Sequence, residues 1–144
     1  MTLMTYLADV NVWLALTLYD HVHHSTALNW FFESSRDKIV FCRITQMGFL
    51  RLLTNRKAIR DDPVKPAAGW KLFDELRGLD RVRFLEEPLD LEKTWREAAI
   101  NHSSGPNWWT DAYLAAFATA AGLTLVTFDK ALAKHPGVHA HLLG

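Results

Sequence analysis

The stretch MTYLADVN, residues 4–11, is a short apolar run that ends in an aspartate, Asp9. A later stretch, LVTFD at residues 125–129, repeats this pattern and ends in Asp129. Continuous apolar runs of this length are typical of strands buried on both faces of a parallel sheet. Because ligands of such sheets bind outside the carboxyl ends of the strands, we expect both aspartates to lie at a functional edge.

The rest of the chain alternates between short apolar runs and longer segments with helical periodicity. The predicted strands are Met4–Ala8, Ile39–Cys42, Arg81–Leu85, Leu123–Phe128 and Val138–Leu143. The predicted helices are Val10–Leu18, His24–Ser34, Thr45–Thr54, Ala67–Leu76, Leu91–Asn101, Thr110–Ala121 and the single turn Lys130–Ala133. The helix His24–Ser34 is expected to turn Ala27, Leu28, Phe31 and Phe32 inward, and Thr45 is the expected N-cap of the helix that runs to Thr54. Loops are predicted at Arg56–Pro66 and Ser103–Asn107. This alternation is typical of an α/β domain.

The composition predicts one folded domain spanning residues 1–144. Apolar residues make up 49% of the chain and charged residues 22%, which argues against disorder. The 16 basic and 16 acidic residues balance, which argues against a strongly basic nucleic-acid coat but permits a local basic patch. Cys42 is the only cysteine, which excludes an internal disulfide and fits a reducing compartment. With no basic N-terminal start and no membrane-length apolar run, we expect a cytoplasmic protein with no membrane partner.

A third carboxylate, Asp111, stands near the start of the Ala-rich segment Thr110–Ala121. If Asp9, Asp111 and Asp129 meet, their charges repel, and a buried carboxylate is costly unless something neutralises it. A hard dication such as Mg²⁺ or Mn²⁺ prefers carboxylate oxygens and would solve this problem. Such an ion also lowers the pKa of a bound water and binds phosphate oxygens, so the pattern favours a metal site for phosphate chemistry.

Each aspartate also has a purely structural interpretation. Asp111 could favour the positive end of a helix, and Asp129 could cap the turn that follows it. Asp9 is harder to explain in this way, because nine mostly apolar residues follow it directly. The three together are more specific than any one alone.

The same residues carry a resemblance to a known family. DVNVWLAL, residues 9–16, resembles the opening motif of PIN domains. His21, His23 and His24, followed by Ala27 and Trp30, look like the bacterial VapC toxin branch of that family. Its second, third and fourth motifs are similar to TQMGFLRLL (45–53), TDAYLA (110–115) and LVTFD (125–129). The resemblance extends from about Leu7 to Leu142.

The resemblance implies a three-layer PIN-like fold, in which a mostly parallel five-stranded sheet is flanked by helices. It implies the toxin of a type II toxin–antitoxin system, an Mg²⁺- or Mn²⁺-dependent endoribonuclease with Asp9, Asp111 and Asp129 as catalytic acids and metal ligands. Its implied partners are a VapB-like antitoxin, a second copy of itself, and a tRNA, rRNA or mRNA substrate. We expect hydrolysis to leave 5′-phosphate and 3′-hydroxyl ends without a dedicated histidine base.

Gln46 departs from the family pattern, because many PIN domains place a glutamate in the second motif. Gln46 can still offer a neutral oxygen to a metal or a water, so we predict that it belongs to the catalytic set. It could equally be a plain polar residue near a helix start. The missing negative charge predicts that one metal binds firmly and any second one weakly.

Four more residues are predicted near the acids. Asn11 and Thr127 could orient waters or carboxylates, or simply hydrogen-bond to backbone at the strand ends. Arg43 and Arg51 are predicted to contact RNA phosphates, although they could lie on a solvated face, and Arg51 could pair with an acid.

Two other functions remain open from the sequence. One is a PIN-like module, weakened by Gln46, that binds RNA or protein without cutting. The other is a phosphoryl-transfer or receiver-type α/β domain, which also places aspartates at strand ends. Those domains usually have an acidic pair after the first strand, whereas here Val10 and Asn11 follow Asp9. They also usually have a lysine near the last strands, and here Lys130 directly follows Asp129.

Overall fold

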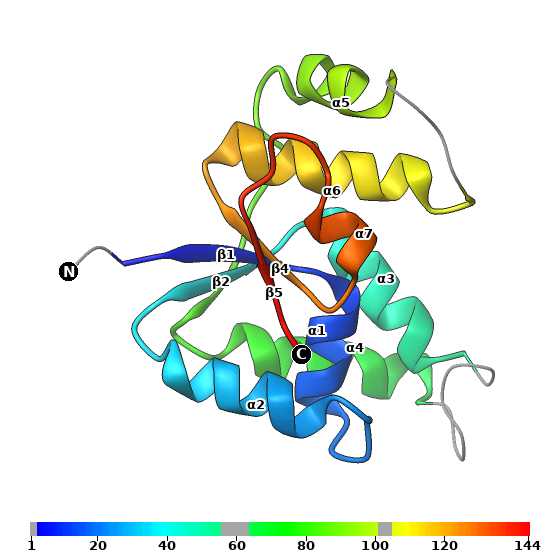
Figure 1. The fold of residues 1–144 in the computed structure, drawn as a ribbon. Coiled ribbons are helices and arrows are strands. Elements are labelled where there is room, and N and C mark those ends of the chain that lie inside the picture. Colours follow the sequence, from blue (N-terminus) through cyan, green and yellow to red (C-terminus); the bar gives the residue numbers. More distant parts are fainter. Residues whose placement is uncertain (1–2, 56–63, 101–104) are drawn as a thin grey trace.

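The computed structural model describes residues 3–55, 64–100 and 105–144, and a five-stranded sheet lies at its centre (Figure 1). The strands are β1 (Thr5–Ala8), β2 (Lys38–Phe41), β3 (Val82–Phe84), β4 (Thr124–Thr127) and β5 (Ala140–Leu142). They are hydrogen-bonded in the order β3-β2-β1-β4-β5, and every neighbouring pair is parallel. The prediction of a parallel five-stranded sheet is confirmed.

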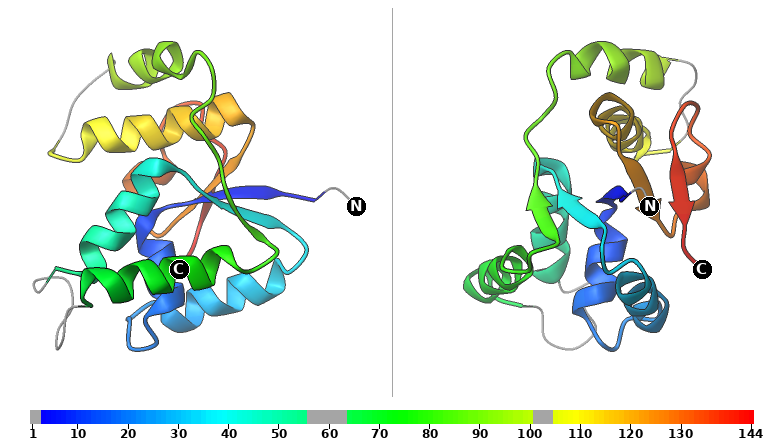
Figure 2. Two further views of the ribbon diagram at one scale, coloured as in Figure 1. Left: turned by 180° about the vertical axis from the view of Figure 1, so that it is seen from behind. Right: turned by 90° about the vertical axis from the view of Figure 1, so that its left-hand side faces the viewer.

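Helices cover both faces of this sheet, which gives the predicted three layers (Figures 1 and 2). One layer contains α1 (Val10–Thr17), α2 (His24–Glu33), α3 (Arg43–Leu53) and α4 (Pro66–Arg77). The other contains α5 (Leu91–Ile100), α6 (Trp108–Ala121) and the short α7 (Lys130–Ala133). Within the described ranges, no helix is both long and apolar enough to cross a membrane.

The strands are buried on both faces, as their continuous apolar character predicts. In β1, Tyr6 and Ala8 pack into the core beneath α1–α4, whereas Leu7 packs into the core beneath α5–α7. Beneath α1, the rings of Trp13 and Phe41 are stacked, with centroids 3.8 Å apart. The two cores hold the carboxyl end of β1 in a fixed position between the layers.

The strand order places a crevice at the carboxyl ends of β1 and β4. From β1 the chain goes on to β2 and β3 on one side, and later returns to add β4 and β5 on the other. The connections therefore leave β1 and β4 in opposite directions. Parallel sheets bind their ligands at such a point, outside the carboxyl ends of the two strands. Asp9 and Asp129 follow these two strands.

Two predicted helix starts were wrong. Thr45 is not the N-cap of α3, because the helix begins at Arg43 and Cys42 is the cap. Thr45 instead accepts a hydrogen bond at Oγ1 from the Cys42 backbone N–H (2.9 Å), so the hydroxyl group of this capping box lies inside the helix rather than before it. Similarly, α6 begins at Trp108 rather than Thr110, which makes Asp111 its fourth residue.

The predicted inner face of α2 was partly wrong. Ala27 and Trp30 are buried, and Phe31 packs against the same core, but Phe32 is 65% exposed. Because helix residues three or four apart share a face, burying Ala27 and Trp30 turns Phe32 outward. The predicted loops Arg56–Pro66 and Ser103–Asn107, and the last residue of the predicted helix Leu91–Asn101, lie wholly or partly outside the described residues.

Candidate active site

Asp9, Asp111 and Asp129 line one cavity of about 240 Å³ at the carboxyl ends of β1 and β4. Asp9 follows β1, Asp129 follows β4, and Asp111 comes from the first turns of α6. The structure thus brings together the three acids that the sequence singled out. Their catalytic role remains a prediction.

Asp9 is held on both of its oxygens. Its Oδ1 accepts a hydrogen bond from the Val10 backbone N–H (2.7 Å), which caps α1. Its Oδ2 accepts from the Thr127 hydroxyl (2.9 Å), and the same hydroxyl oxygen accepts from the backbone N–H of Asp129 (2.9 Å). Fully buried Thr127 therefore ties together the ends of β1 and β4, which places it beside the acids as predicted.

Asp129 is held through one oxygen. Its Oδ1 accepts from the backbone N–H groups of Ala131 (2.8 Å) and Leu132 (3.2 Å), which makes it the N-cap of α7. The structural interpretation of Asp129 as a cap is therefore correct, but it does not exclude a role in the cavity. A cap fixes the carboxylate while its second oxygen keeps its capacity to accept.

The electrostatics of the cavity disfavour three negative charges. Burial raises the pKa of Asp9, and the charge of Asp129 raises it further. The hydrogen bonds from Thr127 and Val10 lower this pKa but do not cancel the increase. Burial, followed by the charges of Asp129 and Asp9, raises the pKa of Asp111 to about 6. The cavity therefore favours protonation of Asp9 and Asp111, and a cation placed there would offset this effect.

The donor atoms in the cavity fit a hard dication. Carboxylate oxygens suit Mg²⁺ and Mn²⁺, and Mg²⁺ usually takes only one or two of them directly and keeps several waters. Among the described residues, no group of three or more His, Cys, Asp or Glu side chains is arranged to ligate one ion together. The three carboxylates line the cavity without being preassembled around a single ion position.

The other predicted residues divide into two groups. Asn11 and Arg51 line the acidic cavity with the three aspartates. Gln46 does not line it: the side chain is buried, and its Oε1 accepts a hydrogen bond from the guanidinium of Arg43. Arg43 itself lines a neighbouring cavity, and its guanidinium lies 4.7 Å from the centre of the Phe84 ring.

The face of α3 that reaches the acids carries Met47, Gly48 and Arg51. Gly48 is buried, and a Cβ atom there would lie 2.7 Å from Cγ2 of Val10, so α3 approaches the start of α1 closely at this point. The sequence prediction missed Gly48. The signal was available, because a glycine inside a helical pattern often marks a close approach.

Asn107 and Thr110 also line the acidic cavity and were not predicted. Both precede Asp111, at the start of α6, within one helical turn of it. Residues three or four apart on a helix lie on one face, so the position of Asp111 could have suggested Asn107. Their amide and hydroxyl groups add neutral hydrogen-bonding capacity beside the acids.

Comparison with known proteins gives concordant matches. The model of the PIN domain family matches residues 6–138. Ribonuclease VapC41 of Mycobacterium tuberculosis is 40% identical over 142 residues, which cover 95% of this chain and 97% of that protein. The crystal structure of VapBC2 from Rickettsia felis, bound to a DNA fragment from their promoter, has a TM-score of 0.72 at 16% identity and covers 98% of this chain and 100% of that chain. Mycobacterium tuberculosis VapC20, described as a Sarcin-Ricin loop cleaving toxin, has a TM-score of 0.70 at 18% identity, with coverage of 96% and 99%.

Proposed function

The chain belongs to the PIN-domain family and, within it, to the VapC ribonucleases, and from this premise we propose that it is a toxin that hydrolyses RNA with the help of Mg²⁺ or Mn²⁺. The family membership contradicts the receiver-type alternative. The observation that carries the metal dependence is the convergence of Asp9, Asp111 and Asp129 in one cavity, where burial and mutual repulsion raise two of their pKa values.

Asp9, Asp111 and Asp129 would hold the ion. When bound, the ion would supply positive charge to the scissile phosphate and lower the pKa of a water molecule. Thr127 and the Val10 N–H keep both Asp9 oxygens in place, so this carboxylate needs little reorganisation to bind. Such supporting hydrogen bonds usually decide how well a ligand side chain is oriented.

The rim of the cavity offers groups for the RNA itself. Arg51 is exposed on α3 and lines the cavity, which suits it for contact with a phosphate. Asn11 and Asn107 offer amide donors for phosphate oxygens or waters. Their positions support phosphate binding at the same site as the acids.

The partners are part of the proposal. The chain would be neutralised by a VapB-like antitoxin, and it would pair with a second copy of itself. Support comes from its similarity to VapC41 and from its fold, which it shares with VapBC2. An antitoxin could place an arginine near the three carboxylates and so compete with the ion.

The decisive experiment is RNA cleavage by the purified chain with Mg²⁺, with Mn²⁺ and with excess EDTA. We expect cleavage with either ion, none in EDTA, and product ends that carry a 5′-phosphate. Asp9→Asn should lower the rate at least about 100-fold while circular dichroism stays unchanged, because the substitution keeps the size and removes the charge. Full activity of Asp9→Asn, or of the wild type in EDTA, would disprove the proposal. RNA binding without cleavage would favour the non-catalytic module instead.

A further inference from the structure

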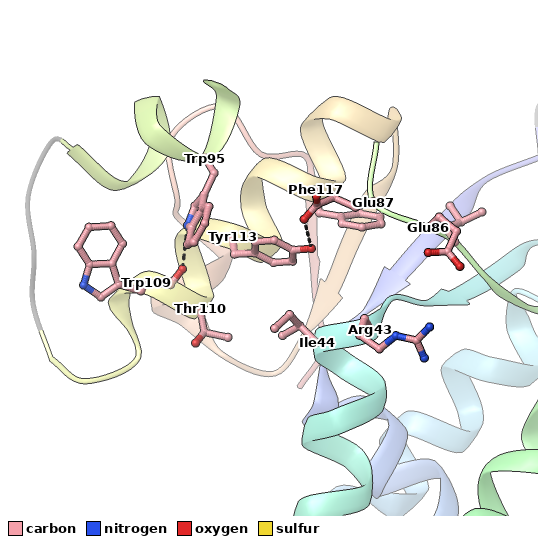
Figure 3. Close-up of a pocket in the computed structure, with 10 residues that line it drawn as sticks. Arg43, Ile44, Glu86, Glu87, Trp95, Trp109, Thr110, Tyr113 and Phe117 are labelled. Atoms are coloured by element: carbon pink, nitrogen blue, oxygen red, sulfur yellow. Dashed lines mark hydrogen bonds between the residues drawn. The ribbon is translucent and has the colours of Figure 1, made fainter. Parts of the chain in front are cut away.

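A second cavity, of about 460 Å³, adjoins the acidic one. Figure 3 shows the residues that line this second cavity. Ile44, at the start of α3, and Thr110, at the start of α6, line both cavities. A ligand that reaches from one cavity to the other would therefore pass between these two side chains. The volume is ample for one planar heterocycle, and the position is next to the proposed cleavage site.

Aromatic side chains form one wall of this cavity. They are Trp95 from α5 and Trp109, Tyr113 and Phe117 from α6 (Figure 3). Trp95 meets Tyr113 edge to face, with centroids 5.4 Å apart, and its indole N–H donates to the carbonyl of Trp109 (3.1 Å). Trp109 is nevertheless 64% exposed, so a large ring is presented to solvent from a backbone that Trp95 holds in place. Such rings provide stacking surfaces for unpaired bases.

Acceptors stand beside this aromatic wall. The hydroxyl of Tyr113 donates to Oε1 of Glu87 (2.9 Å), and Glu86 also lines the cavity (Figure 3). Burial and the hydrogen bond to Glu87 raise the pKa of Tyr113, so its hydroxyl remains a donor. Two carboxylates would repel a phosphate, but they would accept hydrogen bonds from N–H groups on an uncharged ring.

We propose that this cavity, the base pocket, receives one unpaired nucleobase next to the scissile phosphate and that Glu87 selects a base with N–H donors on its edge. The inference rests on the ribonuclease function proposed above and adds nucleotide selection to it. Guanine fits best, because its ring N–H and its exocyclic amino group are adjacent and can face one carboxylate together.

The inference also accounts for Arg43 and Gln46. Gln46 is buried and accepts a hydrogen bond from Arg43, and the Arg43 guanidinium lies over the ring of Phe84, which does not line the base pocket. Arg43 itself lies at the opposite end of the base pocket from Trp109 (Figure 3). Arg43 is therefore held by these two contacts at the end of the base pocket where Glu86 lies. Gln46 acts as a positioning residue for Arg43 rather than as a ligand of the ion.

The first test compares the cleavage rates of the wild type and two variants. Sequencing of the product ends first identifies the site at which the wild type cuts, and a short RNA that contains this site then serves as the substrate. Trp109→Ala should lower kcat/KM by roughly 5- to 150-fold, mainly through KM, because one base loses its stacking partner. Trp70→Ala is the matched control, since Trp70 is a half-exposed tryptophan on α4, a helix of the opposite layer, and it should stay within about twofold of the wild type.

The second test addresses selection. Replacing guanine by inosine removes only the exocyclic amino group, so it should reduce wild-type cleavage at one position beside the cut and leave the other positions unaffected. Glu87→Gln should abolish this difference between guanine and inosine. Equal wild-type cleavage of every inosine-substituted RNA, or unchanged rates for Trp109→Ala, would overturn the base pocket even if RNA is cut.

Binding separates this inference from the nuclease function. Fluorescence anisotropy of labelled tetranucleotides with Asp9→Asn should show tighter binding of the guanine-containing sequence, and adding Trp109→Ala should remove that preference. If the wild type cuts no RNA but this base-dependent binding persists, the nuclease proposal fails and the base pocket stands. If Trp109→Ala weakens only the binding of a protein partner, the pocket belongs to that partner and the inference is wrong.

Discussion

Thr127 is the residue whose single hydroxyl supports two of the three acids. It donates to Asp9 and accepts from the backbone N–H of Asp129. Thr127→Val keeps the shape and removes both hydrogen bonds, so we expect a 10- to 100-fold loss of metal affinity or cleavage rate and a stability loss of about 1–3 kcal/mol. Steady-state cleavage and urea unfolding measure the two effects. Thr124→Val, on the same strand, is the control, and equal rates for both variants would contradict this role.

Asp111 makes the stability of the metal-free protein depend on pH. Burial, followed by the charges of Asp129 and Asp9, raises the pKa of Asp111 to about 6 in the folded chain, above its ordinary value of 3.8, so folding favours the protonated form. Its contribution to the unfolding free energy is therefore present below about pH 4 and is lost as the pH rises through about 6. Urea unfolding in EDTA between pH 4 and 7.5 should show this decrease in the wild type and a smaller one in Asp111→Asn, which retains the similar effect of Asp9. A steeper decrease in the variant would contradict the argument.

The sequence predicted the acids better than their neighbours. Asp9 and Asp129 follow strands that can be recognised from a few apolar residues, so their meeting follows from the rules of parallel sheets. Gln46 was expected in the same site because of its motif, yet the structure pairs it with Arg43. Which face of a helix turns toward a site depends on packing, and no local pattern determines that packing.

Near the acids, α3 and α1 approach each other closely at Gly48. A Cβ at Gly48 would lie 2.7 Å from Val10 Cγ2, so Gly48→Ala should push the helices apart and destabilise the fold by about 1–3 kcal/mol. Gly69→Ala, in α4, is the control, because the nearest atom would be at 3.5 Å and an alanine there should stabilise by about 0.5–1 kcal/mol. Urea unfolding measures both. If Val10→Ala does not relieve the effect of Gly48→Ala, the contact is not the cause.

Most elements could be predicted from the sequence, but their ends could not. The strands and helices were found with shifts of a few residues, because apolar periodicity is a property of whole segments. The starts of α3 and α6 were missed for a chemical reason. Cys42 and Asn107 occupy the cap positions without the expected side-chain hydrogen bond, and the Thr45 hydroxyl lies inside its helix.

For the molecule as a whole, the acidic cavity predicts one strong metal site. With a glutamine in the second motif, and with Gln46 outside the cavity, we expect Mn²⁺ titration calorimetry to show one firm site per chain and any second site much weaker. Saturating Mn²⁺ should also raise the melting temperature, because the ion binds only the folded chain. Asp9→Asn should remove both effects. Two equally tight sites would contradict the prediction.

The strand order and the helix packing that forms the base pocket were beyond the reach of sequence reasoning. The sheet order β3-β2-β1-β4-β5 depends on contacts between residues more than a hundred positions apart. The base pocket requires α5 to pack on α6, which brings Trp95 against Tyr113. No sequence motif predicts the packing of α5 on α6, whereas a strand that ends in an aspartate can be recognised from its own residues.

The timing of synthesis follows from this strand order. Asp9 follows β1, but the neighbouring strand β4 and Asp129 are made more than a hundred residues later. A nascent or truncated chain that stops before residue 124 leaves one edge of β1 bare and lacks an acid. All three carboxylates are therefore present only once residue 129 has been added, so the acidic cavity is among the last parts of the fold that can form.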